Sequence, residues 1–152
     1  MYKIAVAGTG YVGLVAGACF AEVGHLVTCV DVDENKINLM RSGVSPIYEV
    51  DLERLMQRNH TAGRISYTTD YIKAYKDADA IFIGVGTPMQ PDGSANLAYI
   101  AAVARQIAET VEKDCLVVVK STVPVGTNDK VEQFIHDFLP HDGEEYIGNG
   151  AV

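Results

Sequence analysis

The stretch "IAVAGTGYVGLVAGACFAEVGH", residues Ile4 to His25, decides the fold of this chain. It joins an apolar run of strand length to a long helical pattern, and between them stand Gly8, Gly10 and Gly13 at G-x-G-x-x-G spacing. Because glycines are common and the pattern is short, the spacing alone fits either a phosphate-binding turn or an ordinary tight turn. The segments around the glycines must decide between the two.

Each glycine has a separate role if the unit is a strand, a turn and a helix. Gly8 allows the tight turn, Gly10 lets a pyrophosphate approach the backbone, and Gly13 lets the helix pack close to the sheet. The backbone N–H groups of Tyr11 and Val12 then point at the ligand, whose negative charge the helix dipole favours. We therefore expect the diphosphate of a dinucleotide at this turn.

The second strand ends in "VTCVDVDENK", and Asp31 follows its last apolar residue. A carboxylate at this place accepts hydrogen bonds from the adenosine ribose and repels a 2′-phosphate, which favours NAD over NADP. Lys36 would weaken that exclusion. Two alternatives stay open here: Asp31 and Asp33 merely cap the next helix, or the site binds S-adenosylmethionine, which also uses a Gly-rich first loop and an acid on the second strand.

Apolar runs of strand length alternate with helical patterns along the rest of the chain. We expect strands at residues 3–7, 26–30, 65–68, 80–85, 116–120 and 145–147, and helices at 11–23, 34–41, 52–57, 71–76, 97–111 and 128–138. The strands are nearly continuous runs of Val, Ile and Ala, which indicates burial on both faces, as in a parallel sheet. The order predicts one α/β domain over residues 1–152, a doubly wound parallel sheet in three layers of the Rossmann, NAD-binding type.

Two further strand ends carry unusual sequence, and ligands of doubly wound sheets bind at the carboxyl ends of the strands. The fourth strand continues into "IFIGVGTPMQPDG". Gly84 and Gly86 leave the backbone without side chains where the cofactor would cross the sheet, and Pro88 turns the chain away from the sheet. After the fifth comes "VVVKSTVPVGT", with two hydroxyls directly after a buried strand. Either segment could be an ordinary turn. If they bind the cofactor instead, these two segments contribute the predicted cofactor-binding residues Val85, Gly86, Thr87, Pro88, Ser121 and Thr122.

Composition excludes several functional classes. The net charge of −8, without a cluster of Lys and Arg, argues against nucleic acid as a partner. No apolar run approaches the roughly 20 residues of a membrane span, and the chain enters a strand at Lys3 without the features of a signal peptide, so we expect a cytoplasmic protein. Cys19, Cys29 and Cys115 form no CxxC pair and have apolar neighbours, so we expect buried, reduced thiols and no metal site.

Five segments occur in the order and spacing of the UDP-glucose/GDP-mannose dehydrogenases, which this chain resembles from residue 2 to about 140. They are "KIAVAGTGYVG", "VDVDENKI", "SPIYE", "GVGTP" and "VVKSTVPVGT". No one of them is decisive, but the set is specific. "GTGYVG" together with "STVPVGT" is more similar to the UDP-glucose branch than to the GDP-mannose or N-acetylhexosamine branches.

The resemblance implies an enzyme that uses two NAD to oxidise C6 of a nucleotide sugar from alcohol to carboxylate, through a cysteine-bound thiohemiacetal and thioester. It also implies a homodimer. Carried over to this sequence, Val12 and its glycines would meet the pyrophosphate, and Asp31 and Lys36 would hold the ribose. Thr87 would line the dinucleotide site. Thr122 would be the catalytic residue near the nicotinamide, orienting the water or substrate oxygen.

The chain also departs from the family pattern. "IYEVD" stands where the family has "YEPG". The substrate-side glutamate segment, the central helix, the sugar-binding lysine and asparagine, the nucleophilic cysteine and the UDP-binding domain have no counterpart in these 152 residues. We therefore expect the NAD-binding domain of a longer enzyme, which binds NAD without turnover. The alternatives are another nucleotide-sugar dehydrogenase and a free-standing NAD-sensing module.

Overall fold

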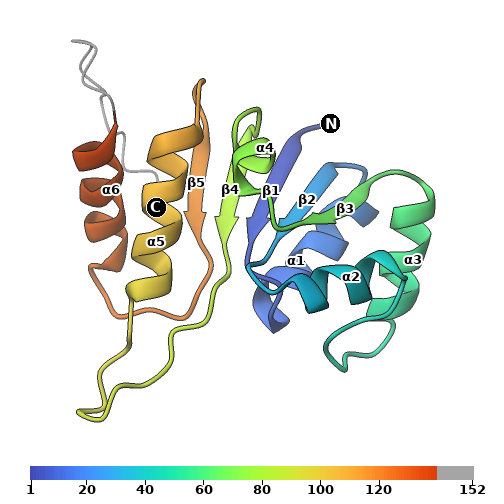
Figure 1. The fold of residues 1–152 in the computed structure, drawn as a ribbon, viewed down its shortest axis with the longest axis horizontal. Helices are drawn as coiled ribbons and strands as arrows, with labels where there is room; N and C mark the ends of the chain where they lie inside the picture. Colours follow the sequence, from blue (N-terminus) through green and yellow to red (C-terminus); the bar gives the residue numbers. More distant parts are fainter. Residues whose placement is uncertain (140–152) are drawn as a thin grey trace.

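A single parallel sheet organises the computed structural model, which describes residues 1–139. Its strand order is β3-β2-β1-β4-β5 (Figure 1). The strands are β1 (Lys3–Ala7), β2 (Leu26–Val30), β3 (Ile65–Thr68), β4 (Ala80–Ile83) and β5 (Leu116–Val119). This confirms the predicted doubly wound sheet. The strand predicted at residues 145–147 lies outside the described residues.

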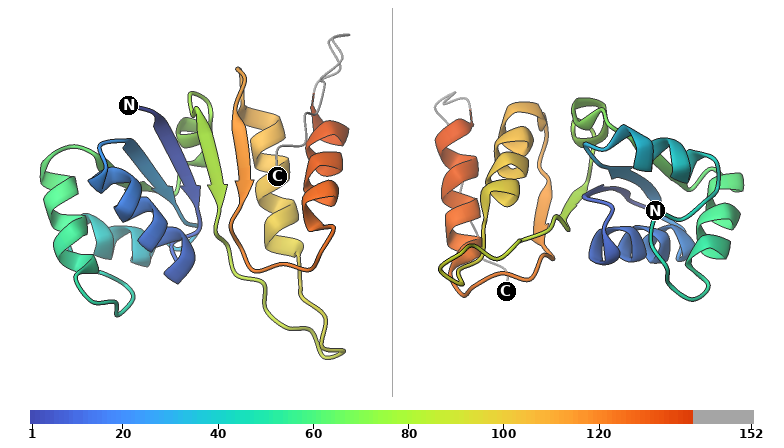
Figure 2. Two further views of the ribbon diagram at one scale, coloured as in Figure 1. Left: turned by 180° about the vertical axis from the view of Figure 1, so that it is seen from behind. Right: turned by 60° about the horizontal axis from the view of Figure 1, so that its bottom comes forward.

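Helices cover both faces of this sheet, so the three predicted layers are confirmed (Figure 2). They are α1 (Tyr11–Glu22), α2 (Glu34–Arg41), α3 (Leu52–Thr61), α4 (Tyr71–Tyr75), α5 (Ala98–Thr110) and α6 (Thr127–Phe138). α1 and α3 pack together on one face, and α2 packs against β3. α4 and α5 pack on the other face, where α6 lies beside α5.

Successive residues of β1 contribute to different cores. Ile4 and Val6 join the cluster formed with α1, α2 and α3, whereas Ala5 and Ala7 join the cluster formed with α4 and α5. Side chains alternate along a strand, so a strand between two helical layers buries both sets. This double burial explains why the strands read as continuous apolar runs rather than as an alternation of apolar and polar residues.

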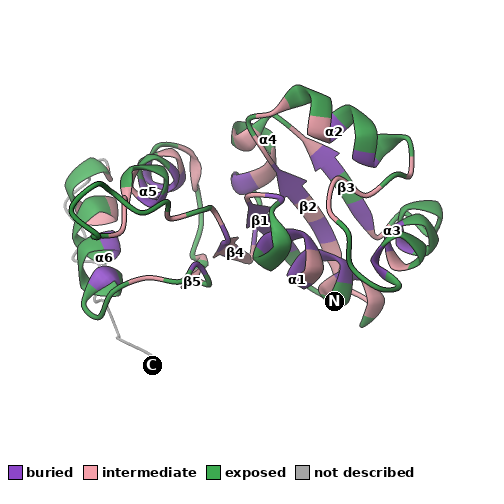
Figure 3. Cartoon of the chain, turned by 90° about the horizontal axis from the view of Figure 1, so that it is seen from below, coloured by how far each residue is buried: buried purple, intermediate pink, exposed green. Residues whose placement is uncertain are grey.

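β1 lies in the middle of the sheet, hydrogen-bonded to β2 on one side and to β4 on the other. The chain first builds outward through β2 and β3, then returns across the sheet to place β4 on the opposite side of β1. This reversal makes the carboxyl ends of β1 and β4 the topological switch point, where open α/β sheets bind ligands. Figure 3 looks onto that edge, and α1 begins there, directly after β1.

Several element boundaries differ from the sequence-based expectations. β4 ends at Ile83 rather than at residue 85, because the backbone at Gly84 approaches the start of α1. α3 continues to Thr61 instead of stopping at residue 57. Its extra turn contains Asn59, a fully buried polar residue whose side chain donates to Glu22 Oε2 at 2.8 Å and accepts from Arg64 Nε at 2.8 Å. A buried amide with hydrogen-bond partners breaks the apolar pattern that the prediction relied on.

One cysteine prediction was wrong. Cys29 is buried and Cys115 is partly buried, but Cys19 is exposed. Cys19 lies on the side of α1 that borders a surface hollow, together with the apolar side chains of Val12, Val15 and Phe20. α1 is apolar on its outward side as well as on its packed side, so apolar neighbours in the sequence did not indicate burial.

The segment before α3 contains an unusual backbone conformation. Asp51 has φ +62°, and it is the one non-glycine residue with positive φ within residues 1–139. It occupies the place at which the family pattern "YEPG" has its glycine. Its side chain makes no capping hydrogen bond to α3, but it forms an ion pair with Arg54 at 3.1 Å.

Candidate cofactor-binding site

Two of the three glycines in the first turn are required by the protein's own backbone. Gly8 has φ +97°, and a Cβ added there would lie 2.9 Å from the carbonyl oxygen of Gly84. A Cβ on Gly13 would lie only 2.0 Å from the carbonyl oxygen of Gly8. Gly84 in turn fits against Gly13, since its Cβ would meet the Gly13 Cα at 2.9 Å. The turn, the start of α1 and the end of β4 are therefore packed backbone to backbone.

Gly10 differs from its neighbours, because nothing in the protein requires a glycine at this position. It has φ −76°, which any residue can adopt, and no atom lies within 4 Å of a Cβ built there. The space above Gly10 is open where a side chain would otherwise project. This is the arrangement expected if a ligand, rather than protein packing, needs the backbone bare.

The N-terminus of α1 is left without a side-chain cap. Gly10 is the N-cap residue, no side chain accepts from the first turn, and no acidic residue lies in that turn. Asp33 and Asp70 cap α2 and α4, whereas α3 and α6, like α1, have no side-chain cap hydrogen bond at their N-cap residues. The N–H groups of Tyr11, Val12 and Gly13 precede the first intrahelical hydrogen bond, which Leu14 donates to the Gly10 carbonyl at 2.9 Å. A helix start with free donors and no cap is suited to an anion.

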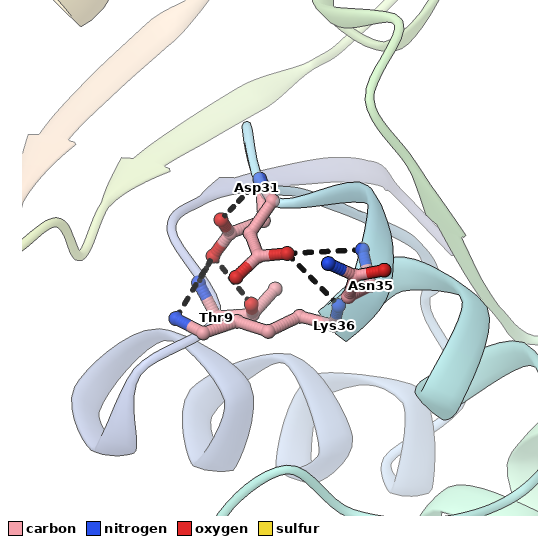
Figure 4. A network of polar contacts seen from close by, with 5 residues as sticks. Thr9, Asp31, Asn35 and Lys36 are labelled. Carbon is pink, nitrogen blue, oxygen red and sulfur yellow. Dashed lines mark hydrogen bonds and ion pairs between the residues drawn. The ribbon is translucent and has the colours of Figure 1, made fainter.

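Asp31 lies beside this turn at the end of β2, in a network of polar contacts (Figure 4). Its Oδ2 accepts from the Thr9 hydroxyl at 2.5 Å and from the Thr9 backbone N–H at 3.0 Å. Its Oδ1 accepts from the Asp33 backbone N–H at 3.0 Å, and Lys36 Nζ lies 4.0 Å from Oδ2. The network joins the turn after β1 to the turn after β2.

The two aspartates of this segment have different roles. Asp33 caps α2, since its Oδ1 accepts from the N–H groups of Asn35 and Lys36 at 2.9 and 3.3 Å. Asp31 accepts from neither. The alternative in which Asp31 merely caps the next helix is therefore wrong, and the alternative for Asp33 is confirmed. The pattern "DVD" did not distinguish the two residues, because both follow the strand directly.

The surroundings of Asp31 keep its carboxylate ionised. Partial burial raises the pKa of Asp31, but the hydrogen bonds from the Thr9 hydroxyl, the Asp33 N–H and the Thr9 N–H, with the charge of Lys36, outweigh burial and lower the pKa below its ordinary value. The carboxylate is therefore a charged acceptor at neutral pH. Such an acceptor binds hydroxyl donors and repels phosphate.

The turns after β4 and β5 are tied together by hydroxyl groups. Thr87 Oγ1 donates to the carbonyl oxygen of Thr122 at 2.8 Å. Ser121 is buried, and its Oγ donates to the carbonyl oxygen of Val85 at 2.7 Å. The Ser121 hydroxyl is thus already used within the protein, whereas Thr122 is exposed at this edge. Both residues were predicted to bind the cofactor, and of the two only Thr122 is exposed.

A hollow of about 610 Å³ runs along α1 away from the glycine turn. Of the predicted cofactor residues it includes Tyr11 and Val12, and Lys120 lines it from the end of β5. The Tyr11 hydroxyl donates to the carbonyl oxygen of Tyr48 at 3.0 Å, which connects the glycine turn to the "SPIYE" segment. In the described part of the chain, no group of His, Cys, Asp and Glu could hold a metal ion.

Thr9 is the functional candidate that sequence reasoning missed. It lies between Gly8 and Gly10, where the glycine pattern allows any residue, so nothing marked it. The available signal was a hydroxyl residue inside a turn otherwise made of glycines, one strand away from a carboxylate.

Comparison with known proteins supports the dinucleotide interpretation. Residues 2–145 match the NAD-binding domain of the UDP-glucose/GDP-mannose dehydrogenase family. The chain is 53% identical over 137 residues to the UDP-glucose 6-dehydrogenase YwqF of Bacillus subtilis, covering 90% of this chain and 31% of that protein. It is 48% identical to the UDP-glucose 6-dehydrogenase of Rhizobium meliloti, covering 97% and 34%. The chain therefore spans about a third of the length of the curated relatives it matches.

Solved structures show the same similarity. The GDP-mannose dehydrogenase of Pseudomonas aeruginosa, in a ternary complex, is 44% identical with a TM-score of 0.85, covering 90% of this chain and 32% of that one. The UDP-glucose dehydrogenase of Pyrobaculum islandicum is 40% identical with a TM-score of 0.85, covering 90% and 33%. None of the helices within residues 1–139 is long and apolar enough to cross a membrane.

Proposed function

The chain belongs to the UDP-glucose/GDP-mannose dehydrogenase family as its NAD-binding domain, and we propose that it supplies the NAD site of an enzyme that oxidises UDP-glucose to UDP-glucuronate. The named relatives support UDP-glucose as the substrate, because the two quoted above are UDP-glucose 6-dehydrogenases. Residues 1–152 would form one dinucleotide-binding domain, in which NAD serves as the hydride acceptor.

One observation carries this proposal. Gly10 is open above the uncapped start of α1, while Gly8 and Gly13 are fixed by the protein's own backbone. A phosphate-binding turn needs this combination, since the ligand requires access to N–H donors held in a rigid frame. The diphosphate would lie against Gly8, Gly10, Tyr11, Val12 and Gly13.

The remaining cofactor contacts follow from the other strand ends. Asp31, with its carboxylate ionised and Lys36 beside it, would accept from the adenosine ribose. The turns after β4 and β5 would flank the rest of the dinucleotide through Val85, Gly86, Thr87, Pro88, Ser121 and Thr122. The family resemblance implies that Thr122 has the catalytic role of orienting an oxygen at the reacting carbon, and the exposure of Thr122 with its backbone held by Thr87 supports this role.

A second substrate class has support of its own. The GDP-mannose dehydrogenase quoted above is 44% identical to this chain, close to the value for the UDP-glucose enzymes. The NAD site is common to both activities, so its residues do not distinguish between the two sugars.

We assign the protein to the cytoplasm because its cysteines are free thiols, as in reducing compartments.

Titration calorimetry on the 152-residue chain tests the proposal. We expect NAD to bind more tightly than NADP, and S-adenosylmethionine not to bind. We also expect no NADH formation when UDP-glucose and NAD are added together, because the nucleophile and the sugar site that the family's chemistry needs are not among these residues. Binding of S-adenosylmethionine in place of NAD, or measurable turnover, would contradict the proposal.

A further inference from the structure

We propose that Thr9 is a positioning residue for cofactor selection, whose side-chain hydroxyl holds the Asp31 carboxylate in the orientation that receives the ribose of NAD and rejects the 2′-phosphate of NADP. The inference rests on the proposed role of Asp31 in binding NAD. It concerns a residue that makes no contact with the cofactor through its own side chain and acts through its neighbour.

The hydrogen-bond geometry commits the Thr9 hydroxyl to Asp31. Thr9 is fully buried, and its Oγ1 lies 2.5 Å from Asp31 Oδ2. A hydroxyl has one hydrogen to donate, so this bond uses the donor capacity of the side chain. Because the Thr9 side chain is buried and its hydroxyl already donates to Asp31, it cannot donate to a ligand. Thr9 therefore differs from the residues that would contact NAD directly.

The network also determines which oxygen of Asp31 remains available. Oδ2 accepts two hydrogen bonds, from the hydroxyl and from the backbone N–H of Thr9. Oδ1 accepts one, from the Asp33 N–H. Because a carboxylate oxygen accepts roughly two hydrogen bonds, Oδ2 is saturated within the protein and Oδ1 keeps the remaining capacity. The protein donors on both oxygens also fix the rotation of the carboxylate about its terminal bond.

The same contact also favours the ionised form of Asp31. Burial opposes ionisation of this carboxylate, and the Thr9 hydroxyl is foremost among the contacts that favour it. Without the hydroxyl, Oδ2 keeps a single protein hydrogen bond, from the Thr9 N–H, so the carboxylate is held less firmly against the attraction of Lys36, whose Nζ lies 4.0 Å from Oδ2. A carboxylate displaced toward Lys36 presents its charge less directly to a 2′-phosphate, so the preference between NAD and NADP reports on Thr9 more directly than overall affinity does.

A purely structural role for Thr9 predicts different behaviour. If Thr9 served only to fill the core of the turn, its methyl group would matter as much as its hydroxyl. Thr9→Val keeps the branched shape and removes the hydroxyl, whereas Thr9→Ser keeps the hydroxyl and removes the methyl group. The two substitutions therefore separate packing from positioning at one residue.

The experiment is titration calorimetry of NAD and NADP with the 152-residue chain and its variants. We expect Thr9→Val to weaken NAD binding by about three- to tenfold, because a displaced Asp31 carboxylate loses about one hydrogen bond to the ribose, and to reduce the ratio of NAD to NADP affinity. We expect Thr9→Ser to keep the wild-type ratio. In the Asp31→Ala background, Thr9→Val should cause no further loss, because its effect passes through Asp31.

An unchanged affinity ratio in Thr9→Val, an equal loss in Thr9→Ser, or additive losses in the double variant would each overturn the inference. If Thr9→Val does not fold, as judged by its thermal transition, Thr9→Ala replaces it, and the same contrast with Thr9→Ser decides. A wild-type chain that does not bind NAD would refute the proposed function instead. A wild-type chain that binds NAD, with Asp31→Ala weakened and Thr9→Val unchanged, would refute the role of Thr9 alone.

Discussion

Gly10→Ala should remove NAD binding while leaving the fold intact. The added methyl group meets no protein atom within 4 Å, and the backbone at Gly10, φ −76° and ψ −170°, suits alanine. We therefore expect the fold to be kept and the free energy of unfolding to fall by no more than about 1 kcal/mol, because alanine is a poorer N-cap residue than glycine. The same methyl group would project into the open space in which we place the diphosphate.

The loss of affinity can be estimated from the donors that the methyl group would screen. The N–H groups of Tyr11 and Val12 precede the first hydrogen bond of α1 and are the proposed phosphate donors. A hydrogen bond to a charged group contributes about 1.5–3 kcal/mol, so losing one of these two bonds to the phosphate lowers the affinity for NAD by about 10- to 150-fold. Losing both would take binding below the range of ordinary calorimetry.

Gly13→Ala is the matched control, three residues away on the same turn. Its Cβ would lie 2.0 Å from the Gly8 carbonyl oxygen, so the backbone of the turn must move. We expect a loss of about 3 kcal/mol or more in the free energy of unfolding, the upper end of the cost of over-packing. This is a large share of the roughly 5–15 kcal/mol that stabilises a typical domain.

Urea unfolding and NAD calorimetry on the two variants test this reasoning together. The expected pattern is a stable Gly10→Ala without NAD binding and a strongly destabilised Gly13→Ala. The reasoning fails if Gly10→Ala binds NAD as tightly as the wild type, or if it loses as much stability as Gly13→Ala.

Three other predictions concern charge, strain and thiol exposure. Asp31→Ala should weaken NAD binding by about 1–2 kcal/mol and reduce the discrimination against NADP. Because the pKa of Asp31 is lowered, its carboxylate stays ionised, and calorimetry on the wild type should show no loss of NAD affinity from this contact between pH 7 and about 5. Asp51→Gly should raise the free energy of unfolding in urea by up to about 1 kcal/mol, since φ +62° is strained for aspartate, and Asp51→Ala should not. Iodoacetamide with mass spectrometry should label exposed Cys19 in the folded chain, whereas Cys29, buried with its pKa raised to about 12, should react only on unfolding.

Local patterns were enough to predict the first half of the sheet. β1, β2 and β3 begin and end where the sequence indicated. β1 and β2 are short, mostly apolar runs that end before Gly8 and Asp31, and β3 is a short alternating run of residues that favour strands. The glycine turn and the carboxylate after β2 were recognisable for the same reason, since their meaning depends on the strand just before them.

Contacts between distant residues were not predictable in this way. The fit of Gly84 against Gly13 joins residues far apart in the sequence, and it shortens β4 relative to the expectation. The direction of the Ser121 hydroxyl depends on the carbonyl of Val85, in the turn after the neighbouring strand β4. Asp31 differs from Asp33 in the hydrogen bonds that it accepts from Thr9, in the turn after β1. Each of these facts requires the sheet to be assembled.

The central position of β1 has a consequence for the order in which the binding turn is completed. The glycine fingerprint and Asp31 all lie within the first 31 residues, but the turn is packed against Gly84, whose N–H donates to the Ala7 carbonyl at 2.8 Å. During synthesis, the ribosome therefore releases the whole recognition sequence long before the segment that gives it a rigid frame. Nucleotide affinity should arise as one of the last events of folding, when the chain closes its long-range pairing between β1 and β4.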